Sequence, residues 1–443
     1  MRCNSFDAQL LASNDASSAD AADSDTLDGS STDGSVDVDS DVYNPPCVSF
    51  QAGNEFQINT TTAGTQDDAV VAAKDTEFIA LWVDRDDLDG AGDGVFAQRF
   101  SKSGSTIGGE FQVNGYTNGN QYAPGVTYAG NGRIISVMKT SQFDSEANDA
   151  AIAQMFNSSA QLLSEFKLND YATNIQGDPA VASLGDRLAF VWYSYGQDGD
   201  DRGIYSRIIA DSGSLIKDEF QVNTYTTDIQ NIPAVAALDN GGYVVTWHSN
   251  LQDSSGYGVY GQVISAAGDA VGSEFRAAQS TTFHQHYSSV VGLENGHFIV
   301  AWHSGTDPDT DVYLRVFSNS GLATSDELRV NQTLSGYQGL STLRGGGRLA
   351  SLGGTRFVIV WESDGQDGSS MGVYYRVFYL SDPATIVPET DEILVNQTTT
   401  DSQSRPKVAA FEDGSFVVSW QSEDQDGDST GVFGRIYSAE SCQ

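Results

Sequence analysis

The chain has 443 residues, enough for several domains or one large repetitive one, and it carries 22 basic residues against 60 acidic ones. The resulting net charge of -38 argues against nucleic acid as a partner, because such binding depends on basic contacts to phosphate. It suits a protein outside the cell or one that binds cations. No apolar run reaches the length of about 18 residues that indicates a membrane-spanning helix, so no transmembrane segment is expected.

Residues 1–46 differ in composition from the rest of the chain. They are rich in Asp, Ser and Ala and contain one basic residue, Arg2. Because such a composition cannot build a core, we expect a solvated spacer, through which copies of the chain contact one another. Cys3 is expected to form an intermolecular bond or to carry a lipid.

From residue 55 onward, one unit of about 55 residues recurs seven times. Each copy opens with a glutamate, an apolar residue and a short alternating run, as in Glu55-Phe56-Gln57-Ile58-Asn59. The copies start at Glu55, Glu110, Glu165, Glu219, Glu274, Glu327 and Glu392. A regular period of this length indicates a solenoid, a propeller or an array, because one unit cannot bury its apolar faces alone.

Within one copy, the pattern predicts four short strands joined by turns and no helix. The fourth copy has small apolar residues at 233–238, an Asp-Asn-Gly-Gly turn, a β-branched and aromatic run at 243–247, and a further strand at 259–264. Four-stranded units repeated around an axis form a β-propeller. We therefore expect an all-β, seven-bladed propeller over residues 47–443, with the small-residue run as the innermost strand of each blade.

The two ends of the repeat array predict how the ring closes. The run 55–59 is an outermost strand with no blade before it, and the last copy ends at 432–437 without an outermost strand. The N-terminal strand should therefore complete the last blade. Cys47 and Cys442 flank this junction, so we expect a disulfide between them, which the loop-entropy model values at about 4–5 kcal/mol and which implies an oxidising compartment.

Two residue types recur at fixed positions of the repeat. All six tryptophans fall in the second strand, with Val137 taking that place in the second copy. We interpret them as packing between blades, and aromatic platforms for sugars are the alternative. A glutamine follows each outermost strand by seven residues. Because its side chain both donates and accepts hydrogen bonds, we interpret it as a latch for the loop into the innermost strand, with a ring of ligand contacts as the alternative.

The loops after the tryptophan strands are acidic and rich in glycine, as in Gln425-Asp426-Gly427-Asp428. Several carboxylates converging at a sharp turn are what a calcium loop needs. The candidate ligands of calcium are Asp84, Asp86, Asp89, Asp198, Asp200, Asp426 and Asp428. The alternative is that Asp-Gly forms the turn between two strands.

Few residues suggest chemistry. All five histidines lie between positions 248 and 303; we expect them to line a polar surface, with a transition-metal site as the alternative. No nucleophile motif, zinc-protease motif or phosphate loop occurs, and spacing singles out no carboxylate pair. Glycosylation sequences of the Asn-x-Ser/Thr type occur at Asn59, Asn157, Asn331 and Asn396.

The repeat resembles one found in bacterial secreted and surface proteins. The shared pattern runs Glu-Phe-Gln-Val-Asn, Pro-Ala-Val-Ala-Ala-Leu, Val-Val-x-Trp, Gln-Asp-Gly and Gly-Val-Tyr-Gly-Gln, and it covers residues 55–437. This resemblance implies an extracellular propeller and no catalytic residues. Residues 1–46 resemble the spacer behind the lipidated cysteine of bacterial surface lipoproteins, which would give Cys3 an anchoring role.

These observations predict a non-enzymatic propeller, extracellular or on the cell surface, that serves surface structure, adhesion or self-assembly, with filaments formed through the N-terminal segment. The alternative is a calcium-assisted, lectin-like module that binds glycans through the acidic loops. A carbohydrate-active enzyme is the third hypothesis, and it requires an unexplained carboxylate pair or histidine cluster in the central funnel.

Overall fold

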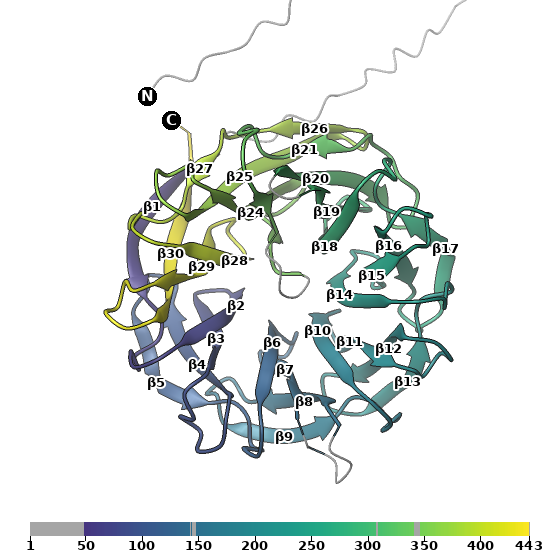
Figure 1. Cartoon of the computed structure of the whole chain (residues 1–443), viewed down its shortest axis with the longest axis horizontal. Coiled ribbons are helices and arrows are strands. Elements are labelled where there is room, and N and C mark those ends of the chain that lie inside the picture. The colour runs from purple at the N-terminus through teal and green to yellow at the C-terminus, as the bar shows by residue number, and fades with distance from the viewer. Residues whose placement is uncertain (1–47, 142, 144–147, 307–308, 341–345, 443) are drawn as a thin grey trace, which may run out of the picture. The chain divides into compact units, whose positions relative to one another are not determined.

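The computed structural model describes residues 48–141, 143, 148–306, 309–340 and 346–442. Over this range the chain is all-β, and its strands form seven antiparallel sheets arranged around a central axis (Figure 1). Within each sheet, consecutive strands are hydrogen-bonded neighbours, and their order leads from the axis outward to the rim. The predicted seven-bladed β-propeller is therefore confirmed, whereas the boundary predicted after residue 46 lies outside the described residues.

The first four blades have four strands each. Blade 1 consists of β2 (Gln66–Lys74), β3 (Glu77–Asp84), β4 (Gly94–Ser101) and β5 (Thr106–Gln112). Blade 2 consists of β6 (Gln121–Tyr128), β7 (Ile134–Thr140), β8 (Ala150–Phe156) and β9 (Leu162–Lys167). Blade 3 consists of β10 (Gln176–Ser183), β11 (Arg187–Tyr195), β12 (Arg202–Ala210) and β13 (Leu215–Gln221). Blade 4 consists of β14 (Gln230–Ala237), β15 (Tyr243–Asn250), β16 (Tyr257–Ile264) and β17 (Ala270–Arg276).

Blades 5 and 6 are less regular: blade 5 has a short outermost strand, and blade 6 has divided innermost and outermost strands. Blade 5 consists of β18 (His284–Gly292), β19 (His297–Thr306), β20 (Asp309–Ser318) and β21 (Leu328–Arg329). Blade 6 consists of β22 (Gln338–Gly339), β23 (Leu349–Ser351), β24 (Arg356–Asp364), β25 (Met371–Asp382), β26 (Thr385–Pro388) and β27 (Ile393–Leu394). Blade 7 consists of β28 (Gln403–Ala410), β29 (Phe416–Glu423), β30 (Thr430–Ser441) and β1 (Val48–Gln57).

Blade 7 closes the ring in the way that the ends of the repeat array predict. The first strand of the chain, β1, pairs antiparallel with β30 from Val48↔Ser441 to Gln57↔Phe433. Cys442 is disulfide-bonded. Its predicted partner, Cys47, lies outside the described residues, as does Cys3, so the pairing of Cys47 with Cys442 stays a prediction.

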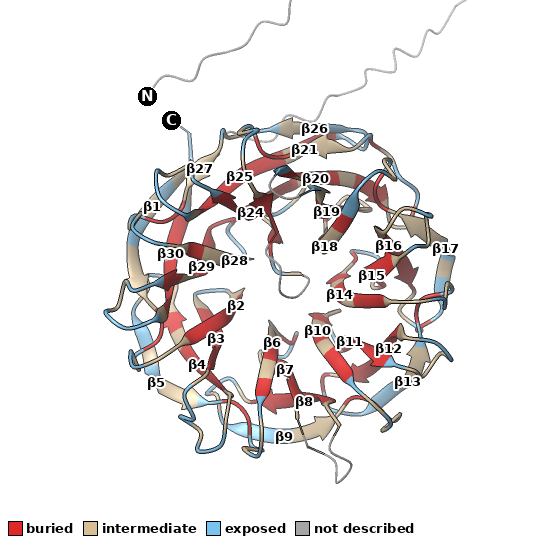
Figure 2. Ribbon diagram, in the orientation of Figure 1, coloured by how far each residue is buried: buried red, intermediate tan, exposed pale blue. Residues whose placement is uncertain are grey.

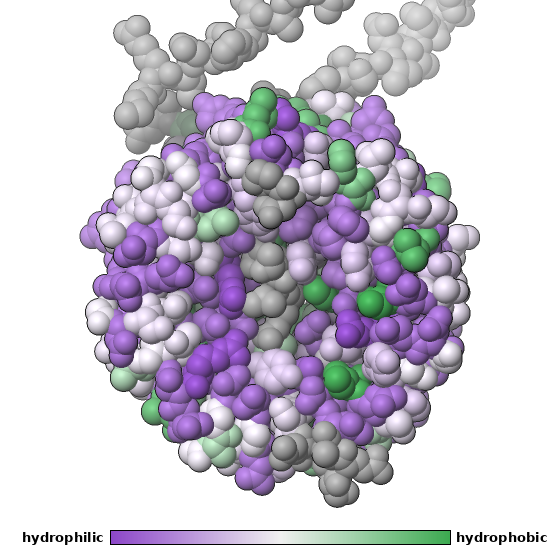
Figure 3. All heavy atoms as spheres, viewed as in Figure 1, coloured by the Kyte–Doolittle hydropathy of each residue, from purple (hydrophilic) through white to green (hydrophobic). Residues whose placement is uncertain are grey.

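The core is divided among the seven junctions between neighbouring blades. A cluster of buried apolar side chains fills each junction, and the second and third strands are buried along most of their length (Figure 2). The face seen in Figure 3 is mostly hydrophilic, with apolar residues occurring singly. Within the described residues, we find no helix with the length and apolarity needed to cross a membrane.

The tryptophans pack in these junctions, as predicted, and do not face a ligand. Each is at most 1% exposed. The six are Trp82, Trp192, Trp247, Trp302, Trp361 and Trp420. Strand pairing corrects one detail, because Met138 and not Val137 takes the tryptophan position in blade 2. In blade 1, Trp82 stands two residues before Asp84, the partner of Gln66. In blade 2, Met138 stands two residues before Thr140, the partner of Gln121.

The recurring glutamine is a structural latch, as predicted. Gln66 Oε1 accepts a hydrogen bond from Asn59 Nδ2 at 3.0 Å, and Gln66 Nε2 donates to the carbonyl oxygen of Ala63 at 2.8 Å. The same Asn–Gln hydrogen bond closes the loop that leads into the innermost strand of four more blades, at Asn114–Gln121, Asn169–Gln176, Asn223–Gln230 and Asn396–Gln403. All seven glutamines are at most 1% exposed, so they do not form a ring of ligand contacts.

The glutamate that opens each repeat ties neighbouring blades together. The carboxylate of Glu110 accepts the backbone N–H of Thr60 at 2.8 Å, across the junction between blades 7 and 1. The glutamine of a Gln-Asp-Gly loop donates to the same kind of carboxylate, as Gln366 Nε2 does to Glu392 at 2.8 Å. The two most recognisable motifs of the repeat therefore form one hydrogen-bonded clasp.

Candidate functional site

The blades differ from one another where the innermost strand enters the sheet near the axis. The two residues after the latch glutamine vary, as Asp67-Asp68, Tyr122-Ala123, Gly177-Asp178, Asn231-Ile232, His286-Tyr287, Gly339-Leu340 and Ser404-Arg405. The second-strand residue paired with the first of these also varies, as Val83, Lys139, Tyr193, His248, His303, Glu362 and Gln421. Because the surrounding positions repeat, these are the positions at which a blade can carry chemistry without loss of the fold.

A ring of β-bulges marks the same place. Six residues that are not glycine adopt φ between 46° and 60° there, at Asp68, Ala123, Asp178, Ile232, Tyr287 and Arg405. The strand register shifts at each of these points. Bulges redirect side chains, and left-handed backbone at such residues costs about 1–3 kcal/mol each, so this ring stores strain around the axis.

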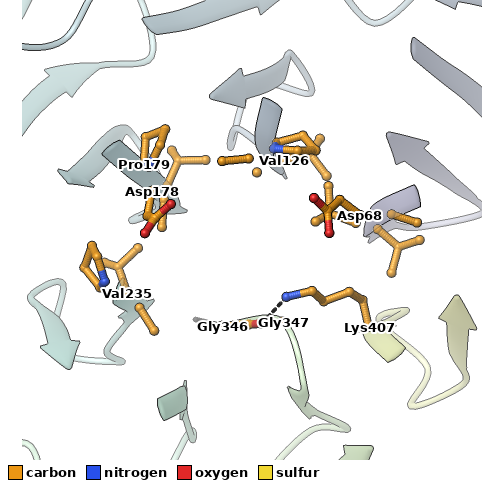
Figure 4. Close-up of a pocket in the computed structure, with 18 of the residues that line it drawn as sticks. Asp68, Val126, Asp178, Pro179, Val235, Gly346, Gly347 and Lys407 are labelled. Carbon is orange, nitrogen blue, oxygen red and sulfur yellow. Dashed lines mark hydrogen bonds between the residues drawn. The ribbon is translucent and has the colours of Figure 1, made fainter. Parts of the chain in front are cut away.

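The axis itself holds a cavity of about 130 Å³. Alanine, proline, valine and glycine residues of the innermost strands line most of it. Figure 4 shows the carboxylates of Asp68 and Asp178 on opposite sides of this cavity, while Lys407 Nζ reaches the carbonyl oxygen of Gly346 at 2.7 Å. The cavity is thus mainly apolar, with a few charged groups at its edge.

We call the end of the axis at which the innermost strands enter the sheets the axial mouth. An ion-pair network occupies the side of this mouth that blades 1 and 7 form. Arg85 contacts Asp67 at 2.9 Å, Asp68 at 3.0 Å and Asp93 at 2.6 Å, and Arg405 contacts Asp68 at 2.6 Å. Burial, reinforced by repulsion from Asp68, raises the pKa of Asp67 although both arginines oppose this. These carboxylates already have cationic partners, which makes them poor candidates for attack on a substrate.

Seven aromatic side chains gather on the side of the mouth formed by blades 4, 5 and 6. We call them the histidine–tyrosine cluster: His248, Tyr257, His284, His286, Tyr287, His303 and Tyr337. His286 lies at its centre, with ring centroids 4.9 Å from Tyr257, 5.4 Å from His248 and 5.8 Å from His303. Four of the five histidines of the chain are therefore brought together here.

Burial sets the protonation state of the cluster. It lowers the pKa of His286 to about 4 and that of His303 to about 3, and it lowers the pKa of His248 well below the usual value. Burial also raises the pKa of Tyr257 and Tyr287. At neutral pH these three imidazoles are therefore neutral proton acceptors, and these two phenols remain proton donors.

Blades 2 and 3 each carry a cation that lies over an aromatic ring. Lys139 Nζ forms an ion pair with Asp149 at 2.6 Å. The guanidinium of Arg202 lies over the ring of Tyr193, 5.2 Å from its centroid. Arg202 is also close enough to His248 for its charge to add to the burial that lowers the pKa of that histidine.

The predicted calcium ligands are all hydrogen-bonded to protein donors. Asp84 accepts from Gln66 Nε2, Asp86 from the backbone of Thr65, and Asp89 from Asn114 Nδ2. Asp198 and Asp426 accept backbone N–H groups of their own loops, while Asp200 and Asp428 accept those of Asp228 and Gly64. Among the described residues, no three His, Cys, Asp or Glu side chains are grouped in a way that could hold a metal ion. Calcium in these loops stays a prediction.

The predicted glycosylation sites fall in two environments. Asn59, Asn331 and Asn396 are at most 3% exposed, and each donates its side-chain amide to the loop that follows it. Asn157 is half-buried in the turn between β8 and β9, where its Nδ2 donates to Gln161. Glycosylation stays a prediction, and Asn157 is its most accessible position.

Sequence reasoning found the grouping of the histidines along the chain but not the site they form. Tyr257, Tyr287 and Arg202 were not among the expected site residues, because none belongs to a motif. The signal that identifies them is a comparison of the seven copies with one another, since these residues stand where the copies differ.

The sequence matches no family model and no curated protein. Solved structures share the fold. A protein of unknown function from Dyadobacter fermentans superposes with a TM-score of 0.53 and 10% identity, over 88% of this chain and 99% of that one. The polysaccharide lyase Uly1 has a TM-score of 0.52 and 9% identity, over 87% and 92%. An α-L-arabinofuranosidase of Fusarium graminearum has a TM-score of 0.47 and 12% identity, over 87% and 97%.

These neighbours correct the function expected from the sequence. A non-enzymatic propeller for surface structure, adhesion or self-assembly was expected because the repeat contains no catalytic motif. That expectation, with the exclusion of enzymatic activity, is wrong: the solved structures that share this fold include a polysaccharide lyase. The likeness itself concerns the fold alone.

Proposed function

We propose that the chain is a carbohydrate-active enzyme that cleaves a polysaccharide by β-elimination at the histidine–tyrosine cluster. The observation that carries the proposal is the position of His286, half-buried and with a pKa of about 4, with its ring centroid 4.9 Å from that of Tyr257. A neutral base beside a protonated phenol supplies both proton transfers that such a reaction needs.

Elimination breaks a glycosidic bond without water. A base removes the proton from the carbon next to a carboxylate, the electron pair forms a carbon–carbon double bond, and the glycosidic carbon–oxygen bond breaks. The leaving oxygen then takes a proton from an acid. We assign His286 as the base and Tyr257 as the acid, because both are partly exposed and neither is held in an ion pair.

The charged side of the mouth supports elimination over hydrolysis. Hydrolysis of a glycosidic bond uses two carboxyl groups, one protonated and one ionised, that are both available to the substrate. Asp67 and Asp68 are instead engaged by Arg85 and Arg405. The acid–base groups that are gathered in the histidine–tyrosine cluster are instead imidazoles and phenols.

The test is an assay on a panel of acidic and neutral polysaccharides, with unsaturated chain ends detected by ultraviolet absorbance and new reducing ends measured in parallel. We expect His286→Ala to lower the rate by about 10²–10⁴-fold, the usual contribution of a general base. His297→Ala is the matched control, because His297 begins β19 and pairs with Ser318, at the end of that strand remote from the cluster.

Two results would overturn the proposal. New reducing ends without unsaturated products would indicate hydrolysis. Equal loss of activity in His286→Ala and His297→Ala would show that the cluster is not the site of reaction.

A location outside the cell or on its surface is part of this proposal. It is supported by the resemblance of the repeat to bacterial secreted and surface proteins and by the strongly acidic composition. Fractionation of the producing cells, followed by detection of the chain in the medium or on intact cells, tests it.

A further inference from the structure

Arg202 has a fixed backbone at the edge of the axial mouth. It begins β12, where it pairs with Tyr195, and a parallel bridge joins it to Ile229 in the loop that enters blade 4. Blade 4 supplies His248 and Tyr257 of the histidine–tyrosine cluster. Arg202 therefore stands at the junction between blade 3 and the cluster.

The guanidinium of Arg202 is not hydrogen-bonded to any group in the described part of the chain. Its side chain is 32% exposed, and the nearest carboxylate oxygen, Oδ1 of Asp201, lies 3.6 Å from Nε, beyond hydrogen-bond length. The Nε atom is buried without a partner. A buried donor that is left unsatisfied costs about 1–3 kcal/mol, so the protein holds this guanidinium in place at a cost in stability.

The other cations of the mouth are different. Arg85 contacts three carboxylates at 2.6–3.0 Å, Arg405 contacts two at 2.6 and 3.2 Å, and Lys139 contacts Asp149 at 2.6 Å. Their charge is neutralised by the protein itself. Arg202 is held less tightly than these three, because its ion pair with Asp201 is long, at 3.6 Å, and no hydrogen bond accompanies it in the described part of the chain.

The ring of Tyr193 holds the guanidinium from one face. The distance from the guanidinium carbon to the ring centroid is 5.2 Å, within the range of a cation–π contact. Stacking on one face leaves the N–H edge available, and that edge has the geometry to bind a carboxylate through two parallel hydrogen bonds.

We infer that Arg202 binds a carboxylate of the substrate, and that the polysaccharide recognised is therefore one that contains uronic acid. This rests on the proposed function, whose elimination step needs a carboxylate next to the carbon that loses its proton, and it adds the residue that binds that carboxylate. A guanidinium on the substrate carboxylate also draws electrons from the neighbouring carbon, which helps a base to remove its proton.

The overall charge makes this recognition local. With a net charge of -38 the chain repels anionic polymers at long range. An acidic polysaccharide would therefore bind only where a short-range cation offsets the repulsion, and its affinity should depend strongly on Arg202. A neutral polysaccharide would not depend on it.

Binding is measured by calorimetry on the full chain carrying His286→Ala, so that no substrate is consumed, with Arg202→Ala, Arg202→Lys and Arg187→Ala added in turn. The ligands are a polyuronate, a neutral polysaccharide of similar length, and a sulfated neutral polysaccharide. Arg187 is the matched control, because it pairs with Ala210 at the opposite end of the ladder that joins Tyr195 to Arg202. Unfolding midpoints of the variants confirm that each one is folded.

We expect Arg202→Ala to weaken polyuronate binding by about 10- to 100-fold, the usual worth of hydrogen bonds to a charged group, and Arg202→Lys to restore only part of it. Arg187→Ala should bind as the parent does. Equal affinity for polyuronate and neutral polymer, or Arg202-dependent binding of the sulfated polymer with no preference for the polyuronate, would overturn the inference.

The two proposals fail in different ways. If His286 is needed for cleavage but Arg202→Ala binds polyuronate normally, the proposed carboxylate site is wrong and the proposed enzymatic activity is retained. If polyuronate binding depends on Arg202 but no polysaccharide is cleaved, the carboxylate site is retained and the proposed enzymatic activity is wrong.

Discussion

Glu55 Oε2 accepts the backbone N–H of Gln397 at 2.7 Å, across 342 positions of the chain. The bond is reciprocal, since the N–H of Glu55 donates to Gln397 Oε1 at 2.8 Å, and the hydroxyl of Thr398 adds a bond to Glu55 Oε1 at 3.0 Å. The same clasp recurs between the other blades, but here one half of it belongs to the first strand of the chain. It therefore fastens the N-terminal strand to blade 6 as well as to blade 7.

Replacement of Glu55 by Ala should lower the free energy of unfolding by about 1–3 kcal/mol, because it removes a charged acceptor and leaves a backbone donor of blade 6 without a partner. Urea unfolding followed by tryptophan fluorescence measures the change. Glu440→Ala, near the exposed end of β30, is the control and should change stability by less than about 0.5 kcal/mol. Equal effects of the two substitutions would contradict a role of the clasp in ring closure.

Replacement of Trp247 by Ala should cost about 3–5 kcal/mol, because the side chain is fully buried in the junction between blades 3 and 4 and its loss leaves a cavity. Leu215→Ala is the control for loss of a large apolar residue, since Leu215 is 57% exposed on the outermost strand β13. It should change stability by less than about 0.5 kcal/mol. A small effect of Trp247→Ala would mean that the junctions can collapse around a missing ring.

Replacement of Ala123 by Gly should leave stability unchanged or raise it by up to about 1 kcal/mol, because Ala123 has φ +60° in the ring of bulges and glycine accepts that conformation without strain. Ala69→Gly is the matched control: Ala69 is equally buried in β2 but is not left-handed. It should cost about 0.5–1 kcal/mol. Denaturant midpoints of the two variants measure the difference. If both midpoints shift in the same direction from that of the parent chain, the result would argue against strain at Ala123.

The architecture was accessible to sequence reasoning because repetition multiplies weak signals. One alternating run such as 243–247 could belong to many folds, but seven copies with a Trp and a Gln at constant positions leave few alternatives to a propeller. Ring closure followed from the unmatched strands at the two ends, which the pairing of β1 with β30 bears out.

The site was not accessible in the same way, because it consists of departures from the repeat. His286 and Tyr257 are 29 positions apart and in different blades, and only the radial arrangement brings their rings together. The acidic loops are conspicuous for the opposite reason: Gln-Asp-Gly recurs from blade to blade, and its glutamine, as at Gln366, holds the glutamate of the clasp.

The buried histidines predict how stability depends on pH. Burial lowers the pKa of His303 from about 6.5 to about 3, and its Nδ1 accepts the backbone N–H of Leu340 at 3.3 Å, which requires the neutral ring. As pH falls, the unfolded chain binds this proton before the folded chain does. The stability due to His303 is therefore fully present above about pH 6.5 and is lost as the pH falls toward 3.

Replacement of His303 by Gln should reduce the slope of the unfolding free energy against pH by the contribution of one proton, which is about 1.4 kcal/mol per pH unit. The charged and titratable groups that face His303 are His286, Tyr287, Tyr337 and Arg348, and they remain in the variant. The free energy of unfolding in urea, measured at intervals from about pH 7 to about pH 4, gives the slope. His297→Gln, at the opposite end of the same strand, should follow the parent chain. A slope unchanged in His303→Gln would mean that this imidazole is hydrated, or already charged, in the folded protein.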